Sequence, residues 1–279
     1  MKEIILREFQ AWQNIKGEHL YLDLPQEQFA NDCPPMLCIG GAAVSMDQPR
    51  LIVISLEPLL DPKTYSQQLD YLSVSDIGAD SRVITWQLDY FKVFPNLLAA
   101  NKTSTHYWGD IHALVSGWCH TQYDNSAISW QTLASSYVEV PLIPMHARSH
   151  TSFINLPANA QMKIRKLFVE RLLWAFDKYR PTAVLALGAD CELETLRALN
   201  ISSTGIVVPI TQYKPQYGRS AKRFEKEILA FVRLPQIKEG MVFVRRAPFT
   251  NWHRPNRLGI HEIGRCLRNY FDKFQSSIT

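Results

Sequence analysis

The sequence predicts an α/β fold: a three-layer α/β/α sandwich built on a central parallel sheet of four to five strands. Short apolar runs of strand length recur along the chain, and helical patterns separate them. Continuous apolar runs are typical of strands that are covered on both faces. We therefore expect right-handed helical crossovers, with any ligand bound beyond the carboxyl ends of the strands.

Four apolar runs are expected to be adjacent parallel strands of one sheet. They are Leu51–Glu57, Val138–Pro144, Ala183–Gly188 and Met241–Arg246, with Ile206–Ile210 as a candidate fifth strand. Helical patterns are found at Glu3–Trp12, His106–Trp118, Lys163–Arg180, Cys191–Leu199 and Gly259–Phe271. The segment from about 59 to 105 is long and poorly periodic, and we expect an insertion that supplies a lid or a substrate wall.

The composition is that of a single globular domain spanning residues 1–279. Hydrophobic residues make up 46% of the chain and charged residues 20%, which argues against disorder. Five scattered cysteines form no C-x-x-C pair, so we expect reduced thiols in a cytoplasmic protein, without a disulfide frame or a zinc site. Charges interrupt the apolar pattern of the first residues, so neither a signal peptide nor a membrane span is expected.

Positive charge is concentrated in the last quarter of the chain. From Lys214 onward there are 14 Lys and Arg against 5 Asp and Glu, whereas the first 213 residues hold 16 against 21. Clustered positive charge interleaved with aromatic residues is typical of a surface that binds phosphates. The sequence therefore predicts DNA as a partner, although a solvated basic tail would give the same count.

Several common catalytic motifs are missing. The chain has no G-x-x-x-x-G-K-[ST] loop, no G-x-G-x-x-G after a strand and no G-x-S-x-G elbow. His146 and His150 have the four-residue spacing of helical metal ligands, but they follow a strand and have no nearby carboxylate or cysteine. We therefore expect neither a metal nor another cofactor.

Polar residues gather where the predicted strands end. The first strand is followed by Glu57 and Asp61, with prolines that stiffen the turn, and it contains Ser55 near its end. A carboxylate at the tip of a buried strand is costly unless it is paired or functional, and a Glu that caps a local turn is the alternative. The fourth strand is followed by a loop rich in cations, aromatic rings and amides, between Arg245 and Asn256. Such a loop suits contacts with phosphates and bases.

At these positions the chain resembles the uracil-DNA glycosylase superfamily. Ser55-Leu56-Glu57-Pro58 stands where that family has a motif such as G-Q-D-P or G-E-A-P, and EVPLIPMHARSH resembles its second strand end. VLALGADCELETL resembles its strand–Gly–helix segment, and MVFVRRAPFTNWHRP takes the place of its H-P-S-P motif. The resemblance covers roughly residues 51–270. Ser55 replaces the family's glycine and no H-P-S-P string is present, which points away from plain uracil as the target.

The resemblance implies a monomeric DNA glycosylase that flips a base out of DNA and hydrolyses its N-glycosidic bond. The expected target is a modified base, such as those of phage DNA, and not plain uracil. Glu57, or alternatively Asp61, would stabilise the sugar cation and position water, while His253 would stabilise the departing base. The base pocket would include Ser55, Phe91, Phe94 and His146. DNA would be contacted by Arg245, Arg246, Phe249, Trp252 and Arg254, with Phe249 or Trp252 as the wedge.

Three other classes remain open at this point. A nucleoside or nucleotide hydrolase would share the carboxylate and the sheet, but it would not need the basic C-terminal quarter. A non-catalytic nucleic-acid-binding module would keep the fold without the acid, and Glu57 argues against it. A structural partner protein would expose a large apolar surface.

Overall fold

The computed structural model describes residues 1–15, 21–46, 50–58, 62–73, 78–94, 106–121, 130–148, 152–200, 207–209, 228–234, 237–244 and 257–276. Its helices are α1 (Lys2–Ile15), α2 (Pro62–Ser73), α3 (Ala79–Leu88), α4 (Tyr90–Val93), α6 (His106–Trp118), α7 (Trp130–Ser136), α8 (Ala158–Tyr179), α9 (Ala189–Ala198) and α11 (Arg257–Ser276), with 3-10 turns η1 (Tyr21–Asp23) and η2 (Phe153–Asn155). Its strands are β1 (Leu51–Ser55), β2 (Tyr137–Pro141), β3 (Ala183–Ala186), β4 (Val207–Pro209), β5 (Ile228–Leu234) and β6 (Ile237–Val244).

The sheet has the strand order β2-β1-β3-β6-β5-β4. β1 pairs in parallel with β2 on one side and with β3 on the other, which confirms the mixed α/β class and the parallel pairing of these three strands. β6 pairs in parallel with β3 over Ala183–Leu185, and β5 and β4 then continue the sheet in the antiparallel sense. The sheet therefore differs from the all-parallel one expected, and the candidate fifth strand pairs antiparallel.

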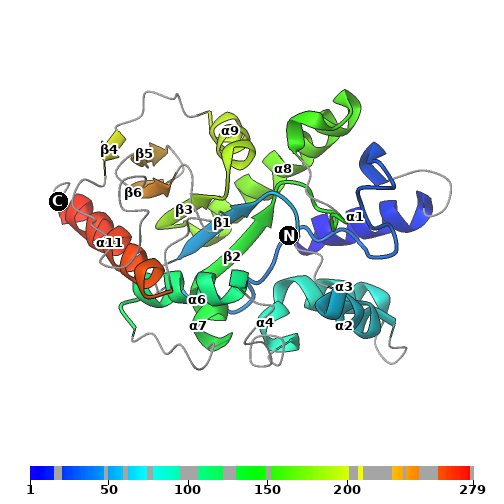
Figure 1. Ribbon diagram of the computed structural model, residues 1–279, viewed down its shortest axis with the longest axis horizontal. Coiled ribbons are helices and arrows are strands. Elements are labelled where there is room, and N and C mark those ends of the chain that lie inside the picture. The colour runs from blue at the N-terminus through cyan, green and yellow to red at the C-terminus, as the bar shows by residue number, and fades with distance from the viewer. Residues whose placement is uncertain are drawn as a thin grey trace.

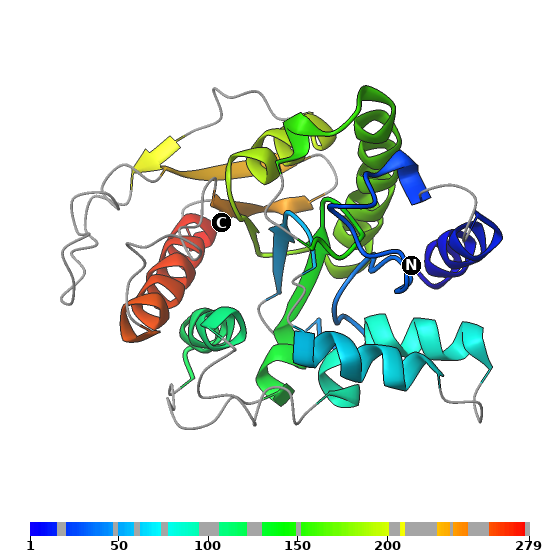
Figure 2. The same cartoon turned by 45° about the vertical axis from the view of Figure 1, so that its right-hand side comes forward.

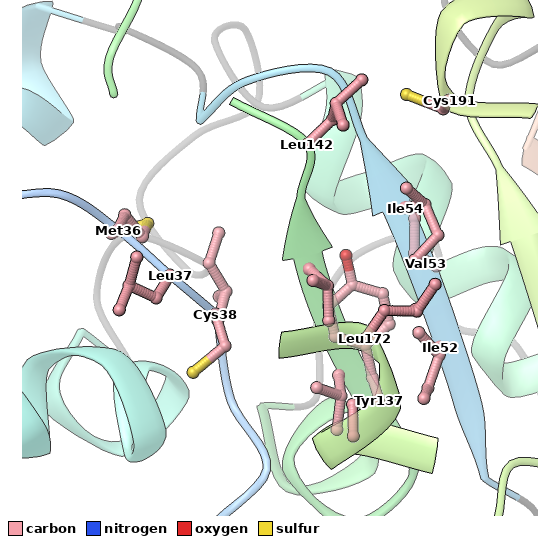
Figure 3. Close-up of a cluster of buried hydrophobic side chains, with 14 of the residues drawn as sticks. Met36, Leu37, Cys38, Ile52, Val53, Ile54, Tyr137, Leu142, Leu172 and Cys191 are labelled. Carbon is pink, nitrogen blue, oxygen red and sulfur yellow. The ribbon is translucent and has the colours of Figure 1, made fainter. Parts of the chain in front are cut away.

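Helices lie on both sides of the sheet. α8 and α9 lie on one side, and α6, α7 and α11 lie on the other (Figure 1). The three parallel strands are buried along their whole length, as the continuous apolar runs predicted. Figure 3 shows the core around them: Leu172 of α8 lies against β1 and β2, and Cys191 of α9 lies near Ile54 toward the carboxyl end of β1.

The described residues of the segment between 59 and 105 form α2, α3 and α4, helices that its weak periodicity did not indicate. The reason is that α3 buries the polar residues Arg82 and Gln87 as well as Val83 and Trp86. Both polar atoms of the buried Gln87 amide are hydrogen-bonded: its Oε1 accepts from the Leu37 backbone N at 2.7 Å and its Nε2 donates to the Pro35 carbonyl at 3.0 Å. Because polar residues lie on the buried face of α3, its sequence lacks the apolar stripe by which an amphipathic helix is recognised.

α6 and α11 lie side by side in both views (Figure 1 and Figure 2) and approach each other through glycine. A Cβ on Gly264 of α11 would lie 2.1 Å from the Leu114 carbonyl oxygen of α6, and a Cβ on Gly117 would lie 1.9 Å from the His261 carbonyl oxygen. Real Cβ atoms do not approach backbone this closely, so the two helix backbones are in contact only because both positions are glycine.

We expect Gly264→Ala to lower the free energy of unfolding by about 1–3 kcal/mol, since the methyl group forces α6 and α11 apart. The matched control is Gly78→Ala, because a Cβ at Gly78 meets nothing within 4 Å. That change should alter stability by less than about 1 kcal/mol. Urea unfolding of both variants measures the difference, and equal midpoints would contradict the close helix packing.

Candidate active site

Glu57 lies two residues beyond the end of β1, at the carboxyl edge of the sheet. The backbone leading to it is fixed by β2, because Leu142 N donates to the Ser55 carbonyl and Ile143 N donates to the Leu56 carbonyl, both at 2.7 Å. Its Oε2 atom is inaccessible to solvent and has no hydrogen-bond partner among the described residues. The backbone that leads to Glu57 is thus fixed, and its Oε2 atom forms no structural bond with the described residues.

The environment of Glu57 disfavours its ionised form. Burial, and secondly the negative charge of Asp190, raise the pKa of the Glu57 carboxyl from its ordinary value of 4.5 to about 7. A carboxyl group with a pKa near the operating pH is suited to proton transfer. Strongly perturbed pKa values are concentrated at functional sites, although structural clusters produce them as well.

Asp190 comes to Glu57 from the first turn of α9, where a carboxylate is favoured by the helix dipole. α9 begins directly after Gly188, whose φ of 97° lies in the left-handed region that glycine tolerates. The Oδ2 atom of Asp190 accepts from Ser152 Oγ at 2.9 Å and from the Phe153 backbone N at 2.8 Å. Asp190 therefore ties the turn after β2 to the carboxyl edge of β1 and β3.

Cys191, next to Asp190, is a buried thiol and not a nucleophile. Burial and then the charges of Glu57 and Asp190 raise the pKa of its thiol well above the ordinary value of 9.0. A thiol that stays protonated does not attack an electrophile at neutral pH. The Cys191 thiol is therefore set aside, and the Glu57 carboxyl stays the candidate reactive group at this strand end.

Ser55 is the last residue of β1 and is buried. Its Oγ atom is inaccessible to solvent and has no partner among the described residues. A buried hydroxyl without a partner is unfavourable by itself and is available to a ligand group. Ser55 precedes Glu57 by two residues, and its assignment to the base pocket stays a prediction.

His146 is fully buried after the end of β2. Its ring lies 5.4 Å from the Tyr65 ring of α2 and 6.4 Å from the Trp86 ring of α3, measured between ring centroids. The 59–105 segment therefore forms an aromatic wall over His146.

Phe91 and Phe94 do not reach the carboxyl edge. Phe91 is buried, and its ring lies 5.7 Å from that of Tyr137, the first residue of β2 and so at the opposite, amino edge of the sheet. Phe94 is also buried and packs on Tyr90 and Tyr71. Both rings belong to an aromatic core cluster, which corrects their assignment to the base pocket: hydrophobic burial, and not base stacking, accounts for their positions.

The remaining predicted site residues lie outside the described residues. They are Asp61, Arg245, Arg246, Phe249, Trp252, His253 and Arg254. The geometry of the site on the described residues therefore rests on Glu57, Ser55, Asp190 and the turn that Asp190 holds.

Sequence reasoning missed Asp190 and the turn after β2. A usable signal existed in Asp190, which follows a strand–Gly junction at the carboxyl edge, where ligands bind in such sheets. The contact with Ser152 carries no such signal, because it joins residues 38 positions apart.

Within the described ranges, no cluster of three or more His, Cys, Asp and Glu side chains is arranged to hold a metal ion. Among the same residues, no helix has both the length and the apolar character needed to cross a membrane. No protein-family model and no curated protein sequence matches this chain. The functional inference therefore depends on the site itself.

Proposed function

We propose that this protein is a DNA glycosylase of the three-layer α/β/α type that resembles the uracil-DNA glycosylase superfamily. The observation that supports it most is Glu57, a carboxyl group at the carboxyl edge of a parallel sheet, with a solvent-inaccessible oxygen and a pKa raised to about 7. Such a group is poised to take a proton from water at neutral pH. The basic C-terminal quarter of the chain supports DNA as the substrate.

In the proposed reaction the C1′–N bond of an extruded nucleotide breaks, and its electron pair leaves with the base. Ionised Glu57 faces the sugar, where its charge stabilises the cation that develops at C1′. Water then adds its oxygen to C1′ and gives a proton to the Glu57 carboxylate, while the departing base nitrogen is protonated by His253 or solvent. The products are an abasic site and the free base.

A purely structural role for Glu57 is less favourable. A buried carboxyl group that serves structure is normally bonded, as Glu139 of β2 is by the Tyr137 hydroxyl at 2.5 Å. Glu57 Oε2 has no such bond among the described residues, and the neighbouring negative charge makes its ionisation still more costly. This contrast between Glu57, just beyond β1, and Glu139 of the neighbouring strand β2 favours an enzyme over a binding module that has lost its acid.

The proposal includes a modified base as the target, a monomeric protein, a cytoplasmic location and a role against phage with modified DNA. Ser55 with its unbonded hydroxyl, in place of a glycine, supports a target other than plain uracil. The five cysteines are free thiols, which suits a reducing compartment.

The experiment is abasic-site formation on a panel of duplexes that carry single modified bases, read as strand breaks after alkaline cleavage. The protein should cleave at one or more modified positions and leave the unmodified duplex intact. The corresponding free nucleosides are the second arm, because release of base from nucleosides alone would indicate a nucleoside hydrolase. If base is released neither from the duplexes nor from the free nucleosides, the proposal is overturned.

The rate should rise as the pH rises through about 7, because only ionised Glu57 accepts a proton from water. Asp190→Asn removes the negative charge that helps to raise the pKa of Glu57, but keeps an acceptor oxygen for Ser152 and Phe153. The midpoint of the pH–rate profile should therefore move to lower pH, yet stay above 4.5, since burial is the larger cause of the raised pKa. A midpoint that does not move, or that moves upward, would contradict this assignment.

A further inference from the structure

An exposed isoleucine lies beside the proposed active site. Ile154 is the middle residue of η2, and 71% of it is accessible to solvent. Two further apolar residues on the flanking helices are exposed as well, Met162 of α8 and Leu193 of α9. Large apolar side chains at the surface near a site are typical of a contact with a partner.

The backbone that carries Ile154 is fixed from both sides. Asp190 Oδ2 accepts from Ser152 Oγ and from Phe153 N, and Phe153 itself is buried. The Gln161 amide donates to the Ile154 carbonyl at 3.1 Å and to the Leu156 carbonyl at 2.8 Å. A side chain on a fixed backbone loses little conformational freedom when it enters a binding partner.

Two arginines lie near this turn, and the carboxylate that pairs with both of them is buried. Arg165 and Arg197 both bond to Glu194, with the shortest distances 2.9 and 2.6 Å. The arginine side chains are 40% and 54% exposed, whereas Glu194 is 3% exposed. The Arg165 guanidinium also lies 5.1 Å from the centre of the Phe153 ring. The surface thus presents two guanidinium groups, which suit phosphate oxygens.

We infer that Ile154, Arg165 and Arg197, together the Ile154 surface, contact DNA at the active site: Ile154 enters the base stack, and the two arginines bind phosphates. The inference rests on the proposed function and adds to it a second contact surface, separate from the C-terminal loop. Its position supports it, because Asp190 bonds to the turn that carries Ile154 and its charge also acts on Glu57. An apolar wedge and nearby cations are what base extrusion requires.

Fluorescence anisotropy tests the inference with two labelled duplexes of one sequence, one intact and one with a single tetrahydrofuran abasic-site analogue. Ile154→Ala should weaken binding to the analogue duplex about tenfold, because a buried apolar contact is lost, and change binding to the intact duplex little. Arg197→Gln should weaken binding to both duplexes and reduce the slope of log affinity against log salt by about 0.9.

Matched controls lie elsewhere on the surface. Met46 is 51% exposed, and Arg7 has a 52% exposed side chain bonded to carboxylates, so Met46→Ala and Arg7→Gln should bind both duplexes as the wild type does. If Ile154→Ala and Arg197→Gln behave like these controls while the wild type prefers the analogue duplex, the inference that the Ile154 surface contacts DNA is overturned and the proposed function stands. If the wild type binds neither duplex, both are overturned.

Discussion

Glu57→Gln is expected to reduce base release by at least about a hundredfold, while affinity for DNA stays near that of the wild type. The amide keeps the size of the side chain but neither carries a negative charge toward the sugar nor accepts a proton from water. Single-turnover cleavage of the modified duplex identified in the panel measures the rate, and anisotropy with the same duplex measures binding.

The same substitution is expected to stabilise the fold at alkaline pH. The carboxyl group has a pKa of about 7 in the folded protein and 4.5 as its ordinary value, so above pH 7 the folded state carries an ionised group in an unfavourable place. The difference corresponds to roughly 3 kcal/mol, which Gln removes at pH 8. At pH 4 the group is protonated in both states, so the two proteins should unfold alike. A loss of activity accompanied by a gain in stability is the mark of a functional group and not of a structural one.

Asp61→Asn distinguishes the two candidate acids near this strand end. It should retain wild-type activity if Glu57 is the reactive group. Activity in Glu57→Gln together with inactivity in Asp61→Asn would transfer the role to Asp61. If both variants are active, the glycosylase mechanism through this strand end is wrong, and the non-catalytic binding module becomes the better account.

The sequence predicted the parts of the fold that depend on local pattern. Leu51 to Ser55 is apolar up to its last residue, and this continuous run indicated a strand covered on both faces, as β1 is. Glu57 was placed at the carboxyl edge because Pro58 disfavours helix at the preceding residue and the strand ends there. Such signals lie within a few neighbouring residues, so one sequence suffices to find them.

Other parts depend on contacts between distant residues and could not be predicted. Gln87 is buried because it bonds to the Pro35–Leu37 backbone, which the pattern of α3 does not reveal. Phe91 packs on Tyr137 at the amino edge, although an aromatic residue on an insertion equally suits a base pocket. The Ile154 turn is bonded to the carboxyl edge of the sheet through Asp190, 37 positions from Phe153. The resemblance placed no residue there.

The end of β2 is held by Arg171 of α8, a fully buried residue that the sequence pattern did not single out. Its guanidinium donates from Nη1 to the Pro141 carbonyl at 2.8 Å and to the Leu37 carbonyl at 2.9 Å, and from Nη2 to the Leu142 carbonyl at 3.1 Å. Burial lowers the pKa of this side chain to about 10, so it remains protonated at neutral pH. One cation thus joins α8, the chain segment beside β2 and the strand end that leads to His146.

Arg171→Met is expected to lower the free energy of unfolding by about 3 kcal/mol or more, because methionine fills the space but leaves buried carbonyl groups without their donors, at about 1–3 kcal/mol each. The free energy of unfolding of Arg171→Lys should fall between those of the wild type and Arg171→Met, since an ammonium group keeps the charge but cannot reproduce the planar fork of donors. Arg7→Met is the matched control, as its exposed ion pair should contribute less than about 1 kcal/mol. Urea unfolding at pH 7 compares the four proteins. If Arg171→Met unfolds at the midpoint of Arg7→Met, the carbonyl contacts of Arg171 do not stabilise the strand end.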